Sequence, residues 1–328
     1  MLRANQLKRL LTRLVTSSSG ISFRSGDFIK LFGWSIGNCA TSAGWSSRVL
    51  ASLQTMSAAL PGGLFIGSAD QRLTPLVSLA PDDFLRALQE TNSLDPSMGG
   101  IQIRTKGSVA SLLIEWIDER NSPLTTITGT FNESWVDRDN HVESLCTFAK
   151  GLALASETEY LFVSHFADEQ LKRRVEREVL KRISIGQCAP VPGYGAKPAR
   201  YLPYIPWLIV FGPRYVNFFT RAVLNRLPIV ANEWLGDYFF FTTADSPLEH
   251  GTRAVLVRQK ALLEALGRDC FFDPSDPHKI ARGPKYPAGY KIWPDDPYER
   301  WKDLPGVIWD AYLDGDKMDI VSRGTGRK

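Results

Sequence analysis

The sequence predicts an α+β protein with a mainly antiparallel sheet, helices packed on one face, and an irregular N-terminal extension. Three observations support this prediction. The chain has 328 residues, 44% hydrophobic and 23% charged, values typical of soluble globular proteins that bury a large core. Helical and extended patterns alternate from residue 56 onward. Short turns join the extended runs, which favours antiparallel neighbours.

The first 55 residues differ in composition from the rest of the chain. They contain seven basic residues and one acid, Asp27, and subtracting them from the totals of 39 and 35 leaves 32 basic and 34 acidic residues. The remainder is near neutral, so its charge gives no support for a nucleic-acid partner, and none is predicted.

Leucines recur at helical spacing among basic residues in segment 1–16, and serines follow. Three interpretations stay open: an extension upstream of a true start at Met56, an organelle-targeting peptide, or a helix lying weakly on an anionic membrane surface. In each, residues 1–55 lie outside the core fold. The expected organisation is therefore a basic extension at 1–55, one α+β domain at 56–321 and a disordered tail at 322–328.

The first half of the expected domain contains one helix followed by three strands. Pro81 suits a first helical position, and Asp82 and Asp83 suit the positive end of the helix dipole, which predicts a helix over 81–90. The alternating or β-branched runs 101–105, 109–117 and 124–131 predict strands, with a turn at 121–123.

The next elements predicted are a helix over 140–155, a strand over 160–163 and a charged helix over 168–183. Leu171 begins a narrow apolar stripe on the charged helix, whose other positions are rich in Arg and Glu. A solvated surface helix with ion pairs four residues apart is the expected structure.

The most apolar stretch, 201–228, predicts a strand over 205–211 and a helix beginning at Pro213 and ending before Pro228. Val216, Phe219, Val223 and Leu227 share one face of this helix. A membrane span needs about 20 mostly apolar residues, and three arginines in this stretch exclude one. A strand over 238–242 and a helix over 252–266, ended by Gly267, complete the prediction.

The chain offers few candidates for catalysis, and no catalytic residue, cofactor or metal ligand is assigned. The cysteines Cys39, Cys146, Cys188 and Cys270 are widely spaced, which argues against a zinc ribbon and a disulfide scaffold and favours a reducing compartment. His165 with Asp168 and Glu169 is the tightest group of histidine and carboxylates. Asp273, Asp276 and His278 are interpreted as a proline-rich turn rather than a cation site.

The C-terminal region combines acids with aromatic residues, which is the composition of a surface for a basic protein partner. Packing of the same aromatics onto the core is the competing interpretation. The predicted partner-contact residues are Trp293, Asp295, Asp296, Glu299, Trp301, Asp303 and Asp310.

The run PWLIVFGPRYVNFF, followed by LGDYFFFTTADSPLE and RAVLVRQKALLEALGRDCFFDP, resembles bacterial immunity proteins of polymorphic-toxin and type VI secretion systems, nearest the immunity protein 52 family. The resemblance spans residues 100–274 and is strongest over 207–273. It implies a non-catalytic, cytoplasmic α+β protein without a cofactor that binds and blocks a cognate protein toxin in the producing cell. A hydrolase using His165 and Asp168, and a membrane-peripheral protein anchored by residues 1–16, stay open as alternatives.

Overall fold

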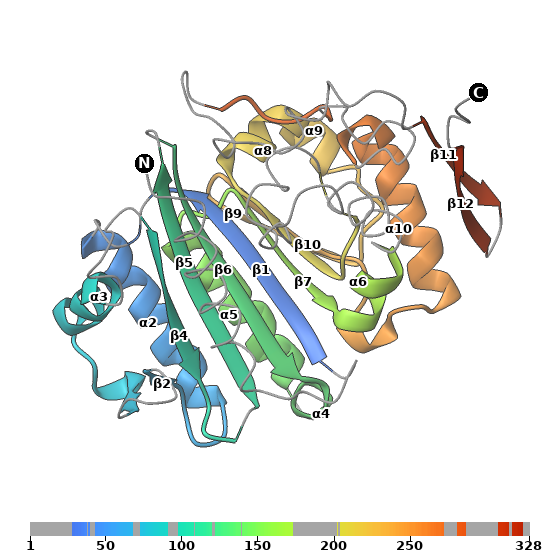
Figure 1. Cartoon of the computed structure of the whole chain (residues 1–328). Coiled ribbons are helices and arrows are strands. Elements are labelled where there is room, and N and C mark those ends of the chain that lie inside the picture. The colour runs from blue at the N-terminus through green and yellow to red at the C-terminus, as the bar shows by residue number, and fades with distance from the viewer. Residues whose placement is uncertain are drawn as a thin grey trace.

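The computed structural model describes residues 28–37, 39, 43–67, 73–90, 98–107, 109–119, 122–138, 140–172, 202, 204–271, 281–286, 308–314 and 317–323. Its main element is a sheet whose described strands pair antiparallel throughout, in the order β3-β2-β4-β5-β6-β1-β7-β8-β10-β9 (Figure 1). The strands are β1 (Phe28–Ile36), β2 (Phe65–Ile66), β3 (Thr74–Pro75), β4 (Met98–Arg104), β5 (Ala110–Glu119), β6 (Ser122–Asn132), β7 (Tyr160–His165), β8 (Leu208–Phe211), β9 (Ala231–Leu235) and β10 (Tyr238–Thr242).

Helices cover both faces of this sheet. The α-helices are α2 (Ala43–Ala59), α3 (Pro81–Glu90), α4 (Glu133–Val136), α5 (His141–Ala155), α6 (Phe166–Lys172), α8 (Pro213–Phe219), α9 (Arg221–Leu224) and α10 (Arg253–Leu266), and the short 3-10 helices are η2 (Leu76–Ser78), η3 (Pro247–Glu249) and η4 (Arg268–Cys270). A separate two-stranded sheet pairs β11 (Ile308–Asp314) with β12 (Lys317–Arg323). The predicted α+β class and mainly antiparallel sheet are confirmed.

Two hydrophobic cores follow from the alternation of side chains along the central strands. In β7, Leu161 and Val163 belong to the core beneath α2 and α5, whereas Tyr160 and Phe162 belong to an aromatic core beneath α8 and α10. Successive strand residues point to opposite faces, so a strand that is apolar at every position is buried on both sides. The sequence predicted helices on one face of the sheet only, so the helices on the second face were not expected.

β1 corrects the expectation that residues 1–55 lie outside the core fold. This strand lies between β6 and β7, with Phe28 opposite Asn132 and Trp34 opposite Tyr160. Its residues are almost all buried, and the expected boundary at 55/56 falls inside α2. The basic composition of the first 55 residues concealed an apolar run, FIKLFGWSI, that is typical of a central strand. Residues 1–27 lie outside the described part of the chain.

Two predicted helices differ from the structure. The charged helix begins as α6, but Asp168 and Glu169 are buried while Leu171 is 62% exposed, so the solvated-face interpretation is wrong for its first turns; residues 173–183 lie outside the described part. The helix after Pro213 breaks at Thr220, whose φ of 68° separates α8 from α9. None of the described helices is long and apolar enough to cross a membrane.

Candidate functional site

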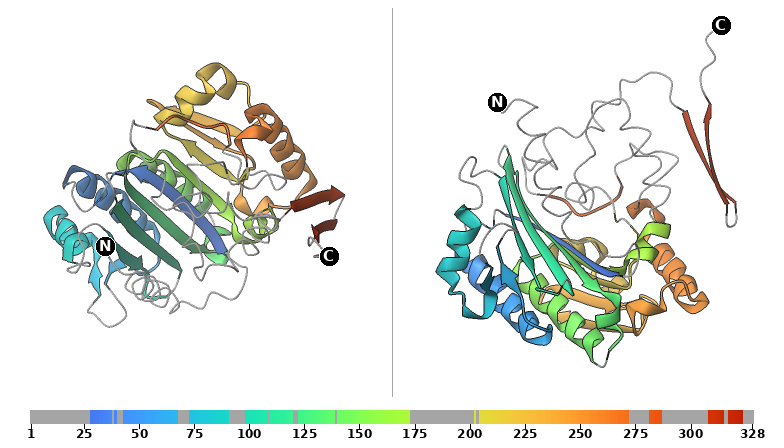
Figure 2. Two further views of the ribbon diagram at one scale, coloured as in Figure 1. Left: turned by 45° about the horizontal axis from the view of Figure 1, so that its top comes forward. Right: turned by 60° about the horizontal axis from the view of Figure 1, so that its bottom comes forward.

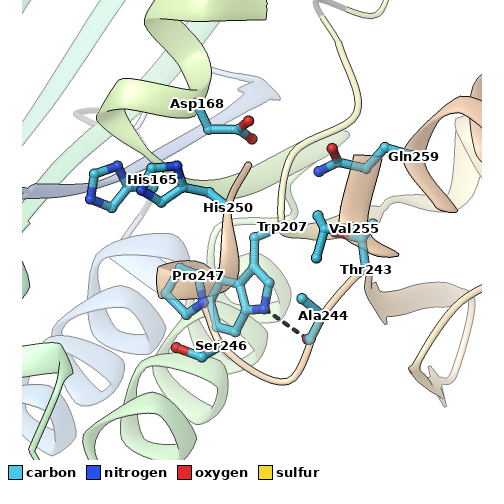
Figure 3. Close-up of a pocket in the computed structure, with 10 residues that line it drawn as sticks. All are labelled: His165, Asp168, Trp207, Thr243, Ala244, Ser246, Pro247, His250, Val255 and Gln259. Carbon is cyan, nitrogen blue, oxygen red and sulfur yellow. Dashed lines mark hydrogen bonds between the residues drawn. The ribbon is translucent and has the colours of Figure 1, made fainter. Parts of the chain in front are cut away.

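The strongest polar cluster of the described chain lies where β7 ends and α6 begins. Here a small hollow opens between β7, α6, the chain after β10 and α10 (Figure 3). The hollow has a volume of about 10 Å³, measured as the space that the centre of a water molecule can occupy. This is roughly enough for one water molecule. The lining residues are His165, Asp168, Trp207, Thr243, Ala244, Ser246, Pro247, His250, Val255 and Gln259.

His165 is the last residue of β7, and both of its ring nitrogens have protein partners. The backbone N–H of Ala167 donates to Nδ1 over 3.1 Å, and Nε2 lies 3.1 Å from Oε2 of Glu133, the first residue of α4. Because Nδ1 accepts a hydrogen bond, the pattern assigns the neutral tautomer that carries its proton on Nε2. His165 thus fixes the turn from β7 into α6 and ties it to α4.

His250 stacks on His165, with ring centroids 3.8 Å apart and planes inclined by 17°. The preceding turn is held by a capping box, in which Ser246 and Glu249 satisfy each other's backbone N–H groups. Burial lowers the pKa of His250, and the facing His165 lowers it further. Both causes favour the neutral form of His250.

Two ion pairs, one half-buried and one buried, extend the cluster through α6. Lys172 donates to Oδ2 of Asp168 over 2.5 Å, to the carbonyl of Ile205 over 3.1 Å and to Oε1 of Gln259 over 2.6 Å. Burial lowers the pKa of Lys172, and Asp168 opposes this shift. Glu169, which follows Asp168 in the chain, forms the second pair: its Oε1 lies 3.4 Å from Nζ of Lys30 in β1. Together these contacts join β1, α6, α10 and the chain before β8.

The arrangement of the rings does not suit a metal ion. Imidazole nitrogens bind metals in the plane of the ring, and nearly parallel stacked rings cannot direct two such nitrogens at one ion. Among the described residues there is no group of three or more His, Cys, Asp or Glu side chains able to hold a metal. Asp273, Asp276 and His278 lie outside the described part.

The structure brings together His165 and Asp168, which the sequence singled out, but directs Glu169 to Lys30 instead. Sequence analysis missed Glu133, His250, Lys172, Gln259 and Lys30, because their partners come from distant elements and no local motif marks them. The described cysteines Cys39, Cys146 and Cys270 form no disulfide bond with one another, and Cys188 lies outside the described residues.

The predicted partner-contact residues stay a prediction. Trp293, Asp295, Asp296, Glu299, Trp301 and Asp303 lie outside the described residues. Asp310 lies in β11, opposite Val321 of β12.

Comparison with known proteins gives a similarity of fold to a solved structure. No protein-family model matches the chain, and no curated protein matches it. The solved structure of a type VI secretion system (T6SS) protein from Pseudomonas aeruginosa has a similar fold, with a TM-score of 0.51 and 13% sequence identity. The match covers 95% of this chain and 98% of that chain. At this identity the likeness shows the fold alone, and the resemblance to the immunity protein 52 family stays a prediction.

Proposed function

We propose that this protein is a non-catalytic, T6SS-associated immunity protein that binds and blocks a cognate protein toxin inside the bacterium that makes it. The observation that carries the proposal is the fold likeness to a T6SS protein over nearly the whole length of both chains. The finer part, immunity, rests on the resemblance of residues 207–273 to the immunity protein 52 family. That segment includes β8, α8, α9, β9, β10 and α10.

The geometry of the polar cluster supports a binding role over a catalytic one. A general base needs a nitrogen or oxygen free to take a proton from a substrate, whereas both nitrogens of His165 are engaged. The carboxylate of Asp168 is held in an ion pair with Lys172. The hollow beside it is about the size of one water molecule. Groups held in this way stabilise a junction between elements.

The proposed contact surface for the toxin is the acidic and aromatic segment 293–303. Acids steer a basic partner toward the surface, and aromatic rings supply binding energy once water is excluded. This surface suits a toxin with a basic active-site face.

The test is co-expression of the full chain with the product of the adjacent gene, provided that this product kills cells when expressed alone. We expect survival and a stable complex that co-purifies. A variant with charge reversal at Asp295, Asp296, Glu299 and Asp303 should lose affinity and the dependence of affinity on salt. The matched control reverses four exposed acids elsewhere, Asp82, Asp83, Glu90 and Asp137, and should keep the complex. Cell death with both proteins well expressed would contradict the proposal.

A second candidate function, hydrolysis, is favoured by the position of His165 and Asp168 beside one hollow. It predicts that a fluorogenic ester or phosphoester panel is turned over by the wild-type chain. The turnover should then disappear in His165→Gln and Asp168→Asn variants that still fold. Survival of toxin-expressing cells with these variants would separate the two functions, because a non-catalytic immunity protein needs neither group for chemistry.

A further inference from the structure

In the described part of the chain, the ten-stranded sheet ends in an exposed edge at β9 (Figures 1 and 2). There β9 pairs only with β10, and its residues 231–233 are exposed. The opposite edge, β3, has two residues, one of them Pro75, which has no N–H to donate. An exposed edge presents backbone N–H and C=O groups to any strand that can lie beside it. β9 is therefore the edge at which a further strand would extend the sheet.

The turn between β9 and β10 determines which backbone groups of β9 point outward. Leu235 and Tyr238 lie opposite each other across the two-residue turn 236–237, and residues that close such a turn exchange hydrogen bonds. Hydrogen-bonded and non-hydrogen-bonded pairs alternate along an antiparallel ladder, so the odd-numbered positions of β9 direct their N–H and C=O groups to β10. Asn232 and Trp234 direct theirs away from the sheet.

β9 lacks the features that usually guard an edge strand against pairing. Such edges often carry a Pro, a Lys or a charge directed outward, and the sequence of β9, ANEWL, has no Pro or Lys. Its one charged residue, Glu233, lies with Oε2 2.7 Å from Nζ of Lys150 in α5. The same Nζ lies 4.3 Å from the ring centre of Phe240, which is opposite Glu233 in β10. The carboxylate is thus held toward the body of the protein, not across the edge.

Apolar surface flanks the β9 edge on the side of α9. The ring of Trp234 lies 4.2 Å beneath the guanidinium of Arg221, and its Nε1 donates to Oδ1 of Asn225 over 2.9 Å. These contacts pack α9 directly over the strand. Val223 of α9 and Val230, which precedes β9, are 39% and 38% exposed. Covering such side chains in a contact would be favourable.

The β9 edge is complementary to a second copy of itself. In an antiparallel pair with a two-fold axis through Glu233, Asn232 of each copy lies opposite Trp234 of the other. Each of these residues has its N–H and C=O directed outward, so every outward group of the two strands finds a partner. The same register places Val230 of each copy beside the turn 236–237 of the other.

We propose that two copies of this chain pair antiparallel through their β9 edges, about a two-fold axis through Glu233, and so form one continuous sheet. Main-chain hydrogen bonds supply the pairing, and apolar surface beside α9 is buried between the copies. The contact uses the same patch on both copies, so the assembly closes at the dimer. It does not involve segment 293–303, so dimer formation is separate from the proposed binding of a toxin.

The first test measures the oligomeric state of the full chain alone by analytical ultracentrifugation, and we expect a dimer. Asn232→Pro removes an outward N–H without removing a donor to β10. It should raise the dissociation constant of the dimer by about tenfold or more, because both copies lose a hydrogen bond. Val230→Asp places a carboxylate in the contact and should have an effect of at least this size.

The control variant is Val257→Asp, which makes the same change on α10 at a position that is 62% exposed. It should dimerise like the wild type. Circular dichroism confirms that each variant is folded, and Val230→Asp carries the test if Asn232→Pro does not fold. A monomeric wild-type chain, or a folded Val230→Asp variant that dimerises like the wild type, would overturn the proposal.

Cross-linking tests the position of the two-fold axis. In Glu233→Cys the Cα atoms that carry the new thiols would lie about 4.5 Å apart, as in other non-hydrogen-bonded pairs, which is within the range of a disulfide. Mild oxidation should give a covalent dimer on a non-reducing gel, with the wild type as background for the native cysteines. In the control, Ala231→Cys, the corresponding atoms would lie about 13 Å apart and should not cross-link. Equal cross-linking of the two variants, or none in either, would contradict this pairing.

Hydrogen exchange distinguishes a second copy from a segment of the same chain. The N–H groups of Asn232 and Trp234 should become protected as the protein concentration rises through the dissociation constant of the dimer. Protection that is independent of concentration would mean that the same chain covers its own edge. Protection only on addition of a toxin would mean that a toxin strand occupies the edge. Either result would overturn pairing between copies.

Discussion

Gly212 lies where the chain leaves β8 and enters α8, in close contact with the backbone that precedes β7. A Cβ at this position would lie 2.3 Å from the carbonyl oxygen of Thr158 and 2.9 Å from Cα of Glu159. Backbone atoms cannot move aside as the end of a side chain can, so we expect Gly212→Ala to lower the free energy of unfolding by about 1–3 kcal/mol. Urea unfolding measures the change. Gly283→Ala, whose Cβ would meet no atom of the described residues within 4 Å, is the control, and equal midpoints for both variants would contradict the close approach.

The stacked histidines predict a pH dependence of stability. The pKa of His250 is lowered in the folded protein by burial and by His165, while Asp168 and Glu133 oppose the shift and Lys172 adds to it. The unfolded chain, with a histidine pKa near 6.5, therefore binds protons more readily than the folded protein. This contribution to stability is complete above about pH 6.5 and is lost as pH falls toward the lowered folded pKa.

The measurement compares urea unfolding at about pH 7.5 and about pH 5.5, which lie on either side of the histidine pKa in the unfolded chain. His250→Gln should lose less stability between these two pH values than the wild type does. His141→Gln, which changes a histidine outside the stacked pair, should lose as much as the wild type. An identical loss for all three proteins would show that the pair does not carry the effect.

At the scale of elements, the buried ion pair between Lys30 and Glu169 fastens β1 to α6. Its side chains are 8% and 2% exposed. Lys30 would stay buried in Glu169→Gln but lose the attraction of this carboxylate, so we expect the variant to lower the free energy of unfolding by about 3–5 kcal/mol. The double variant Lys30→Met with Glu169→Met should recover much of this loss, because it removes both buried charges. A double-mutant cycle in urea measures the coupling, and strictly additive effects would contradict it.

The sequence predicted those elements whose signals are local. Pro81 with two following acids marked the start of α3, and Gly267 marked the end of α10. The break between α8 and α9 had no such signal, because Thr220 adopts a left-handed φ that only tertiary packing imposes on a β-branched residue. β9 was missed because its segment, ANEWL, is short and polar, as suits an exposed edge.

The candidate site was predictable only where its members are close in sequence. His165 and Asp168 are three residues apart, so the chain itself suggested the pair. Lys30 and Glu169 are 139 residues apart, and Glu133 is 32 residues from His165. Pairing of β1 with β6 and β7 brings such residues together, and this pairing is a property of the whole sheet. A charged residue that is buried by tertiary pairing looks, in sequence, like one on a solvated face.

At the scale of the whole molecule, β1 joins the two halves of the sheet. β6, β5 and β4 extend from one side of it, and β7, β8, β10 and β9 extend from the other. Its residues also contribute to both hydrophobic cores, Leu31 to one and Phe32 to the other. Removal of this strand would expose two inner edges and open both cores at once.

This position predicts how the fold depends on the first 55 residues. A chain that starts at Met56 lacks β1 and most of α2, including Val49, Leu50 and Leu53, which are buried. We expect it to show no cooperative thermal transition by circular dichroism, because the edges of β6 and β7 lose their shared partner and the apolar surface under α2 becomes exposed. A chain that starts at Gly26 keeps every described element and should unfold cooperatively, at nearly the same temperature as the full chain. If the Met56 chain instead unfolds cooperatively at that temperature, the two halves of the sheet hold together without β1, and the basic extension lies outside the core after all.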